Sequence, residues 1–197
     1  MTLLLALLAL VVRPLWAPAD LHSIADKAHG FTVFVIAKTG ESQISASGVL
    51  INGGLVLTDL HGLVAKQADG SLSEAEIVVV LDGLGAVPAR LAGADVALGI
   101  AVLRLPDEAR KLPGADIATS DPGVADELLA MGTDGKVVDV LGVRVDHVGL
   151  PLLHTSATLP GSFRGGPLFD ASGHLAALEL PGGAAAASSV LRLLGQR

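Results

Sequence analysis

The chain has 197 residues, of which 51% are hydrophobic and 17% are charged, so it carries enough apolar material for a folded core and is not a disordered chain. Its formal net charge is -7, only 3% of its residues are aromatic and none is tyrosine, which excludes the basic and stacking surfaces of nucleic-acid-binding proteins. Cysteine is absent, which excludes disulfides, thiolate nucleophiles and zinc–thiolate sites.

The first residues have a composition of their own. An apolar run over 2–12 has the length of a signal-peptide core, and Ala17-Pro18-Ala19 forms a small-x-small cleavage pattern. We therefore expect 1–19 to be a signal peptide or a membrane anchor, and the protein to be exported, either periplasmic or anchored facing the periplasm. Because no basic residue precedes the run and Arg13 follows it, an uncleaved amphipathic anchor and a buried core segment stay open as alternatives.

The chain from position 20 to the polar stretch at 106 is dominated by predicted strands. A helix is predicted over 20–29 (DLHSIADKAH), with Asp20 as its N-cap and apolar residues at helical spacing. The polar and proline-containing stretch PDEARKLPGAD (106–116) predicts a linker. Six strands, rich in valine and isoleucine and separated by glycine turns, are predicted at 31–37, 47–51, 55–58, 77–81, 87–93 and 100–105.

The second half of the chain is also rich in predicted strands, but its sequence does not repeat that of the first half. A final helix is predicted through SSVLRLLGQR with Ser188 as its cap. Gly182-Gly183 followed by AAAASS (182–189) is low in complexity and predicts a shortened connection into that helix. Two strand-rich halves around one linker indicate an all-β pair of barrels or sandwiches. The strands predicted here are 127–132, 136–149, 152–157 and 174–180.

Three separated stretches resemble the motifs of one family, the HtrA (Deg) branch of the chymotrypsin-like serine proteases. SGVLINGGLVLTDLHGLV (47–64) resembles the segment with the catalytic histidine, and ARLAGADVALGIAVLRLP (89–106) resembles the strand with the catalytic aspartate. HTSATLPGSFRGGPLFDASGHLAAL (154–178) resembles the nucleophile loop. The resemblance spans 22–197 and implies an all-β, trypsin-like fold of two packed six-stranded β-barrels with short N- and C-terminal helices.

The domain organisation follows from the same resemblance. We expect one trypsin-like protease domain over 20–197, with an N-terminal barrel at 30–105, the linker at 106–116 and a C-terminal barrel at 117–197. Members of this branch carry a peptide-binding PDZ domain after the protease domain, and we expect none in this chain.

Two of the three catalytic positions depart from the family pattern. A serine protease needs a hydroxyl to attack, an imidazole to take its proton and a carboxylate to orient the imidazole. His61 retains the histidine position. Gly99 stands where the family has aspartate, and Arg164, before Gly165 and Gly166, stands where it has the nucleophilic serine; guanidinium is not a nucleophile.

Neighbouring residues are weak substitutes. Ser162, two residues before Arg164, is a substitute nucleophile only if the loop is rebuilt. Asp95 lies about 13 Å along an extended strand from Gly99, too far to replace the aspartate. Asp59, two residues before His61, is at best a local orienter. An active serine endopeptidase with a rearranged triad of His61 and Ser162 is the alternative interpretation.

A new role for Arg164 is also open. By the resemblance, this position lies beside the oxyanion hole and at the mouth of a substrate cleft that also involves His154, Gly161, Gly165 and Gly166. A fixed positive charge there would plug the pocket or bind a carboxylate such as a peptide C-terminus. The alternative is drift, in which the arginine reaches solvent or pairs with a nearby acid.

The six histidines suggest a third interpretation. His154 is expected to face the cleft opposite His61, and two imidazoles could hold a transition metal with a third carboxylate ligand. The sequence has no close-spaced histidine motif, so metal binding is a speculative further alternative, and no cofactor is expected.

The favoured interpretation is an HtrA-like serine protease homologue that is catalytically inactive. We expect it to bind a polypeptide or protein partner as a scaffold or regulator, with active HtrA-type proteases as one candidate partner. No nucleic-acid partner is expected, whereas a membrane tether through 1–19 and a homo-oligomer are both compatible with the sequence.

Overall fold

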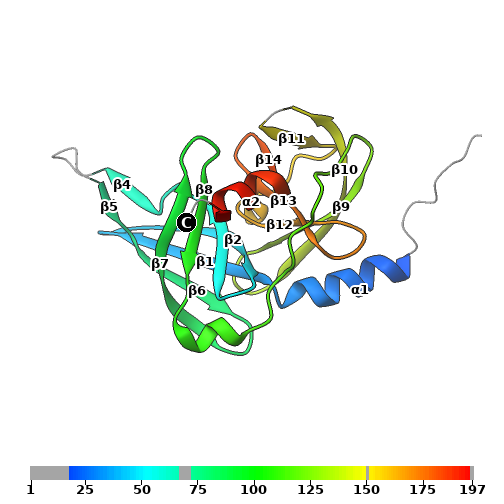
Figure 1. Ribbon diagram of the computed structural model, residues 1–197. Helices are drawn as coiled ribbons and strands as arrows, with labels where there is room; N and C mark the ends of the chain where they lie inside the picture. The colour runs from blue at the N-terminus through cyan, green and yellow to red at the C-terminus, as the bar shows by residue number, and fades with distance from the viewer. Residues whose placement is uncertain (1–17, 67–71, 150, 196–197) are drawn as a thin grey trace, which may run out of the picture.

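The computed structural model describes residues 18–66, 72–149 and 151–195. Two strand bodies lie side by side, one helix lies along the second body and another helix lies between the two (Figure 1). The helices are α1 (Pro18–His29) and α2 (Ala187–Gly195).

The first body is a closed barrel in the strand order β1-β2-β3-β8-β7-β6, with every neighbouring pair antiparallel. Its interior is filled mainly by valine, leucine and alanine, as period-two alternation requires when one face of each strand is buried. The strands are β1 (Thr32–Thr39), β2 (Ser42–Ile51), β3 (Leu55–Asp59), β6 (Glu76–Leu81), β7 (Gly85–Asp95) and β8 (Ile100–Arg104).

The second body is a closed barrel in the order β10-β11-β14-β13-β12-β9. Both barrels therefore have six strands, and the predicted trypsin-like double barrel is confirmed. The strands are β9 (Glu127–Thr133), β10 (Val138–Val148), β11 (Leu152–Thr155), β12 (Pro167–Phe169), β13 (Leu175–Leu180) and β14 (Gly183–Ala186).

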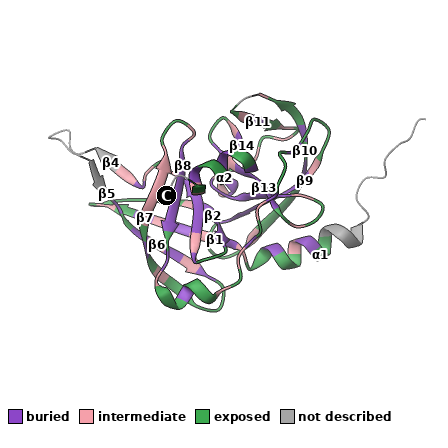
Figure 2. Cartoon of the chain, viewed as in Figure 1, coloured by how far each residue is buried: buried purple, intermediate pink, exposed green. Residues whose placement is uncertain are grey.

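A separate apolar cluster joins the barrels to each other and to both helices. It combines first-barrel residues such as Leu57 and Ile100 with second-barrel residues such as Phe169, and it includes Ile24 from α1 and Val190 from α2. Figure 2 shows this buried material where the two barrels meet. This shared core fixes the two barrels relative to each other.

One sequence prediction about the second barrel is wrong. The stretch 182–189 is not merely a connection, because Gly183–Ala186 form β14, which pairs with β11 on one side and β13 on the other and so closes the barrel. Alanine and glycine have low strand propensity, but barrel closure and the burial of Ala184 and Ala185 outweigh it.

Four short elements were not predicted. Strands β4 (Val64–Lys66) and β5 (Leu72–Glu74) form a two-stranded sheet of their own, and a 3-10 helix, η1 (Asp107–Lys111), occupies part of the predicted linker. A second 3-10 helix, η2 (Gly161–Phe163), lies in the nucleophile loop. Each has three to five residues, which is too short for periodicity to reveal.

The N-terminal helix begins at Pro18, so Asp20 lies inside the helix instead of capping it as predicted. The signal peptide or anchor predicted at 1–19 falls almost wholly outside the described residues, which start at 18. Within those residues, no helix has the length and apolar character needed to cross a membrane.

The predicted cap of α2 is also wrong, because Ser188 lies inside the helix and Asp121 holds its first turn from another loop. The Asp121 carboxylate accepts from the Ser188 backbone N–H at 2.8 Å and from the Ser188 hydroxyl at 2.7 Å. A sequence-distant partner of this kind leaves no local capping pattern.

Replacing Asp121 with alanine is expected to lower the free energy of unfolding by about 1 kcal/mol, the usual effect of removing a helix cap. Urea denaturation measures this change. The control is Asp146→Ala, which removes an exposed carboxylate and is expected to change stability by less than about 0.5 kcal/mol. Equal effects of the two variants would contradict the capping role.

Candidate active site with a replaced nucleophile

His61 follows β3 directly and is oriented by Asp59, the last residue of that strand. The His61 Nδ1 lies 2.8 Å from Asp59 Oδ1, and the His61 backbone N–H donates to the same oxygen at 3.1 Å. The Asp59 side chain is fully buried, whereas that of His61 is 63% exposed. Because a carboxylate only accepts, neutral His61 carries its proton on Nδ1 and has Nε2 as its basic nitrogen.

Gly99 lies at the edge of the His61 ring. A Cβ at position 99 would lie 3.4 Å from His61 Cε1, 3.6 Å from His61 Nδ1 and 3.8 Å from Asp59 Oδ1. Position 99 therefore faces the nitrogen that a catalytic aspartate would bind, and the Asp59 carboxylate makes that contact instead. Asp95 is held elsewhere, by the Leu98 N–H at 3.0 Å and by Arg192 at 3.8 Å.

Arg164 directs its guanidinium at the same carboxylate. Its Nε donates to Asp59 Oδ2, while Oδ1 faces His61, so the two oxygens of one buried carboxylate hold two different residues. The Arg164 side chain is 36% exposed. The arginine thus reaches into the place from which a serine would approach His61, and it pairs with the residue that orients the histidine.

The loop that carries Arg164 is pressed against the first barrel. Gly165 has φ +76°, and a Cβ there would lie 2.4 Å from the Ser47 carbonyl oxygen and 2.8 Å from the Asp59 backbone nitrogen. The Ser47 N–H donates to the Arg164 carbonyl at 2.8 Å. Only glycine fits at position 165, and this tight packing fixes the direction of the preceding side chain.

The backbone N–H of Arg164 is hydrogen-bonded within its own loop. The Arg164 N–H donates to the Gly161 carbonyl at 3.2 Å, which closes the 3-10 turn η2. An oxyanion hole needs backbone N–H groups that are free to bind a developing negative charge. The amide at the nucleophile position is already used inside the loop.

Ser162, the predicted substitute nucleophile, lies on this turn and faces a different barrel strand. Its hydroxyl lies 3.4 Å from Asp139 Oδ2 on β10, and its carbonyl accepts from the Ser47 hydroxyl at 2.6 Å. The structure therefore brings Arg164 and Asp59 to His61 and places Ser162 toward β10.

A hollow of about 470 Å³ adjoins Arg164 on the second-barrel side. Of the residues predicted to border the cleft, His154 and Gly161 line it, whereas Gly165 and Gly166 are buried inside the loop. Glu179 also lines the hollow, and burial raises the pKa of its carboxyl to about 7.

Each of the two histidines considered as metal ligands has another residue as its neighbour. His154 lies opposite His147 across β10 and β11, with the ring centroids 6.1 Å apart, while His61 has Asp59 as its neighbour. Among the residues that the structure describes, no three histidine, aspartate or glutamate side chains converge as a metal site.

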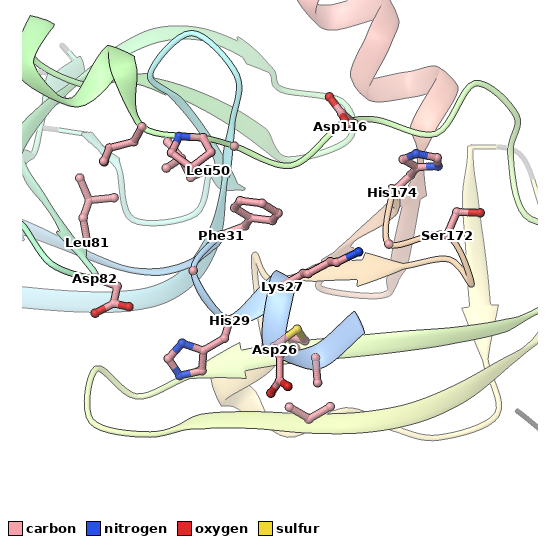
Figure 3. Close-up of a pocket in the computed structure, with 18 residues that line it drawn as sticks. Asp26, Lys27, His29, Phe31, Leu50, Leu81, Asp82, Asp116, Ser172 and His174 are labelled. Atoms are coloured by element: carbon pink, nitrogen blue, oxygen red, sulfur yellow. The ribbon is translucent and has the colours of Figure 1, made fainter. Parts of the chain in front are cut away.

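A larger hollow, of about 990 Å³, lies elsewhere, where α1 meets both barrels. Figure 3 shows Asp26, Lys27 and His29 from α1 near its rim, with Asp116 and His174 on the far side. Neither His61 nor Arg164 lines it, so it is separate from the site described above.

Two residues of the site, Ser47 and Glu179, were not singled out in the sequence, and Asp59 was considered only as a local orienter. The role of Asp59 depends on a turn that folds its side chain back beneath His61, and that of Ser47 depends on contacts with residues more than 80 positions away. Glu179 did leave a trace, because an acidic residue between Leu178 and Leu180 interrupts a buried strand.

Comparisons with known proteins agree with this fold. Among solved structures, the chain is similar to Deg5, with 23% identity, a TM-score of 0.76, and coverage of 90% of this chain and 94% of that one. It is also similar to the serine endoprotease from Yersinia pestis (22% identity, TM-score 0.72, coverage 92% and 67%). A third similar structure is an inactive serine-to-alanine mutant of Rv3671c from M. tuberculosis H37Rv (16% identity, TM-score 0.71, coverage 93% and 96%).

At these low sequence identities the similar structures show only the fold. The family is shown by a match to a family sequence model. No curated protein matches the chain. A family model described as a trypsin-like peptidase domain matches residues 46–178, which is more than half of the 197 residues. The chain therefore belongs to the trypsin-like peptidase family and has the HtrA-type form of its double-barrel fold.

Proposed function

We propose that this protein is a non-hydrolytic member of its family, which binds extended polypeptide segments beside the former nucleophile loop and acts as a scaffold or regulator. The observation that carries the proposal is the Arg164 guanidinium, which occupies the serine's position and is bound to the buried carboxylate of Asp59. Active HtrA-type proteases are one candidate class of partner.

Each chemical requirement for acyl transfer is affected. The nucleophile is missing, since a guanidinium stays protonated and cannot attack a carbonyl. The carboxylate that orients His61 is shared with a cation, which weakens its support for a protonated imidazole during proton transfer. The Arg164 amide is engaged with Gly161, so one donor of the oxyanion hole is lost.

The surface for a ligand is nevertheless retained. The hollow beside Arg164 is bounded by 154–161 on one side and 179–184 on the other, with Leu159 and Pro181 among its apolar lining residues. Its volume of about 470 Å³ suits a side chain of a bound peptide. Binding without cleavage is the function that this combination supports best.

The first test is a labelling experiment with a fluorophosphonate, together with incubation of the protein with β-casein, an unfolded protein rich in extended segments. We expect no covalent adduct by intact-mass spectrometry and no casein fragments, but a measurable association of casein by fluorescence anisotropy. The reason is that the cleft persists while the attacking hydroxyl does not.

The competing endopeptidase hypothesis makes the opposite prediction. Covalent labelling that disappears in Ser162→Ala would show that Ser162 is a nucleophile and would overturn the proposal. If casein neither binds nor is cleaved, the proposal that the protein binds extended polypeptides is contradicted.

A further inference from the structure

Glu179 is the acidic residue among the described lining of the hollow beside Arg164. Its neighbours on β13, Leu178 and Leu180, are 0% and 2% exposed and belong to the core between the barrels. Strand alternation therefore turns Glu179 to the other face, which it shares with the fully buried Ala177 of the second-barrel core.

The nucleophile loop fixes the position of this glutamate. The Glu179 N–H donates to the Gly166 carbonyl at 2.9 Å, and its own carbonyl accepts from the Gly165 N–H at 2.8 Å. These two bonds set the strand against the loop on either side of the residue. The side chain is thus placed in the hollow by backbone contacts and not by an ion pair.

The Glu179 carboxyl has no partner among the residues that the structure describes. Within the described parts of the chain, no donor forms a hydrogen bond or ion pair with it. Burial raises its pKa to about 7, because the charged form is poorly solvated and has no cation to stabilise it. A ligand that supplies a cation would stabilise the charged carboxylate and so offset the free-energy cost of its burial.

The other charged or titratable groups near the hollow do not supply a cation to the Glu179 carboxylate. Arg164 comes from the nucleophile loop, and its Nε is bound to Asp59. His154 comes from β11 and faces His147. The remaining lining residues, from 155–161 and from 180–184, carry no titratable side chain.

We infer that this hollow receives a lysine or arginine side chain of a bound polypeptide, with its charge paired to the Glu179 carboxylate and its methylenes packed on the apolar lining. The inference rests on the proposed function, since it names the ligand chemistry of the same cleft. An unpaired carboxylate also disfavours an acidic ligand here, which argues against capture of a peptide C-terminus by Arg164.

The pairing has a defined pH dependence. Only ionised Glu179 attracts a cation, and the carboxyl is protonated below its pKa of about 7. A lysine ammonium stays charged up to a pKa of about 10.4. Affinity for the cation should therefore rise as the pH increases through about 7 and level off above it.

The test uses two blocked pentapeptides, each of four alanines around a central residue that is either lysine or the equally long, uncharged norleucine. Binding to the full-length protein is followed by NMR chemical-shift changes. We expect the lysine peptide to bind about tenfold more tightly than the norleucine peptide at about pH 8.5. At about pH 5.5 the lysine peptide should bind at least about fivefold more weakly than at the higher pH.

Two variants separate the contributions. Glu179→Gln should abolish the preference for lysine and its pH dependence. Glu76→Gln removes an exposed glutamate on β6, is the matched control and should resemble the wild type. The pH titration of the wild type stands as a separate test if Glu179→Gln does not fold.

The outcomes distinguish this inference from the proposed function. Equal binding of both peptides, or a lysine preference that survives in Glu179→Gln, would overturn the cation pocket and leave a peptide-binding cleft. Cleavage of the lysine peptide would overturn the non-hydrolytic function and leave the pocket. Binding of neither peptide at millimolar concentration would overturn both.

Discussion

Replacing Arg164 with serine is expected to make the protein react covalently with a fluorophosphonate, which the wild-type chain should not do. The substitution supplies the missing hydroxyl and also removes the cation from Asp59 Oδ2, so the carboxylate is left to orient and support His61 alone. Gly165 and the packing of its loop keep the new side chain directed at the same place. Intact-mass spectrometry over time measures the reaction.

The reaction should be slow. One donor of the oxyanion hole, the N–H at position 164, is bound to Gly161, and loss of one oxyanion-hole donor slows a serine protease by about 10²–10³. We therefore expect labelling over hours and little or no turnover of peptides.

Second-site variants identify the groups responsible. In the Arg164→Ser background, His61→Ala should abolish labelling and Asp59→Asn should slow it by about 10⁴, the effect of removing the orienting carboxylate from a triad. Ser162→Ala should leave it unchanged, because that hydroxyl faces Asp139. A folded Arg164→Ser variant that never labels would refute the role assigned to Asp59 as a relocated orienting carboxylate.

The sequence predicted the double barrel because local pattern and fold agree over most of the chain. Strands such as β6 and β8 are continuous apolar runs bounded by turn residues, and three motifs in the family's order link them. The failures lie where tertiary structure overrides local preference. The alanine-rich β14 exists because its two neighbours need a partner, and α2 is capped by a residue 67 positions away.

The sequence indicates which positions of the site depart from the family pattern, but not which contacts the residues make there. Matching the motifs identifies Gly99 and Arg164 as the altered positions. Motif spacing does not tell where a side chain turns, and the central contact of the site, Arg164 with Asp59, joins residues 105 positions apart. The sequence left open both a new role and drift for Arg164, and the structure shows the arginine bound to a buried acid.

Replacing Arg164 with alanine is expected to lower the free energy of unfolding by about 2–3 kcal/mol. The Asp59 side chain is fully buried, so its carboxylate would keep only the hydrogen bonds from His61, and an uncompensated buried charge is costly. The expected loss is smaller than the 3–5 kcal/mol of a fully buried pair, because the Arg164 side chain is 36% exposed and partly screened by water. Urea denaturation measures the change.

The matched control is Arg110→Ala, which removes an exposed arginine paired with Asp107 at 3.0 Å and should cost less than about 0.5 kcal/mol. Combining Arg164→Ala with Asp59→Asn also removes the buried negative charge of Asp59, which Arg164→Ala alone leaves without a cation. The double variant should therefore be more stable, by about 2 kcal/mol, than the sum of the two single effects predicts. Additive effects would mean that the two side chains do not interact in solution. A positive coupling would instead show that the arginine stabilises the fold through the carboxylate that orients His61. Selection on stability alone would then retain Arg164, and the loss of the serine would be maintained by the packing of the site itself.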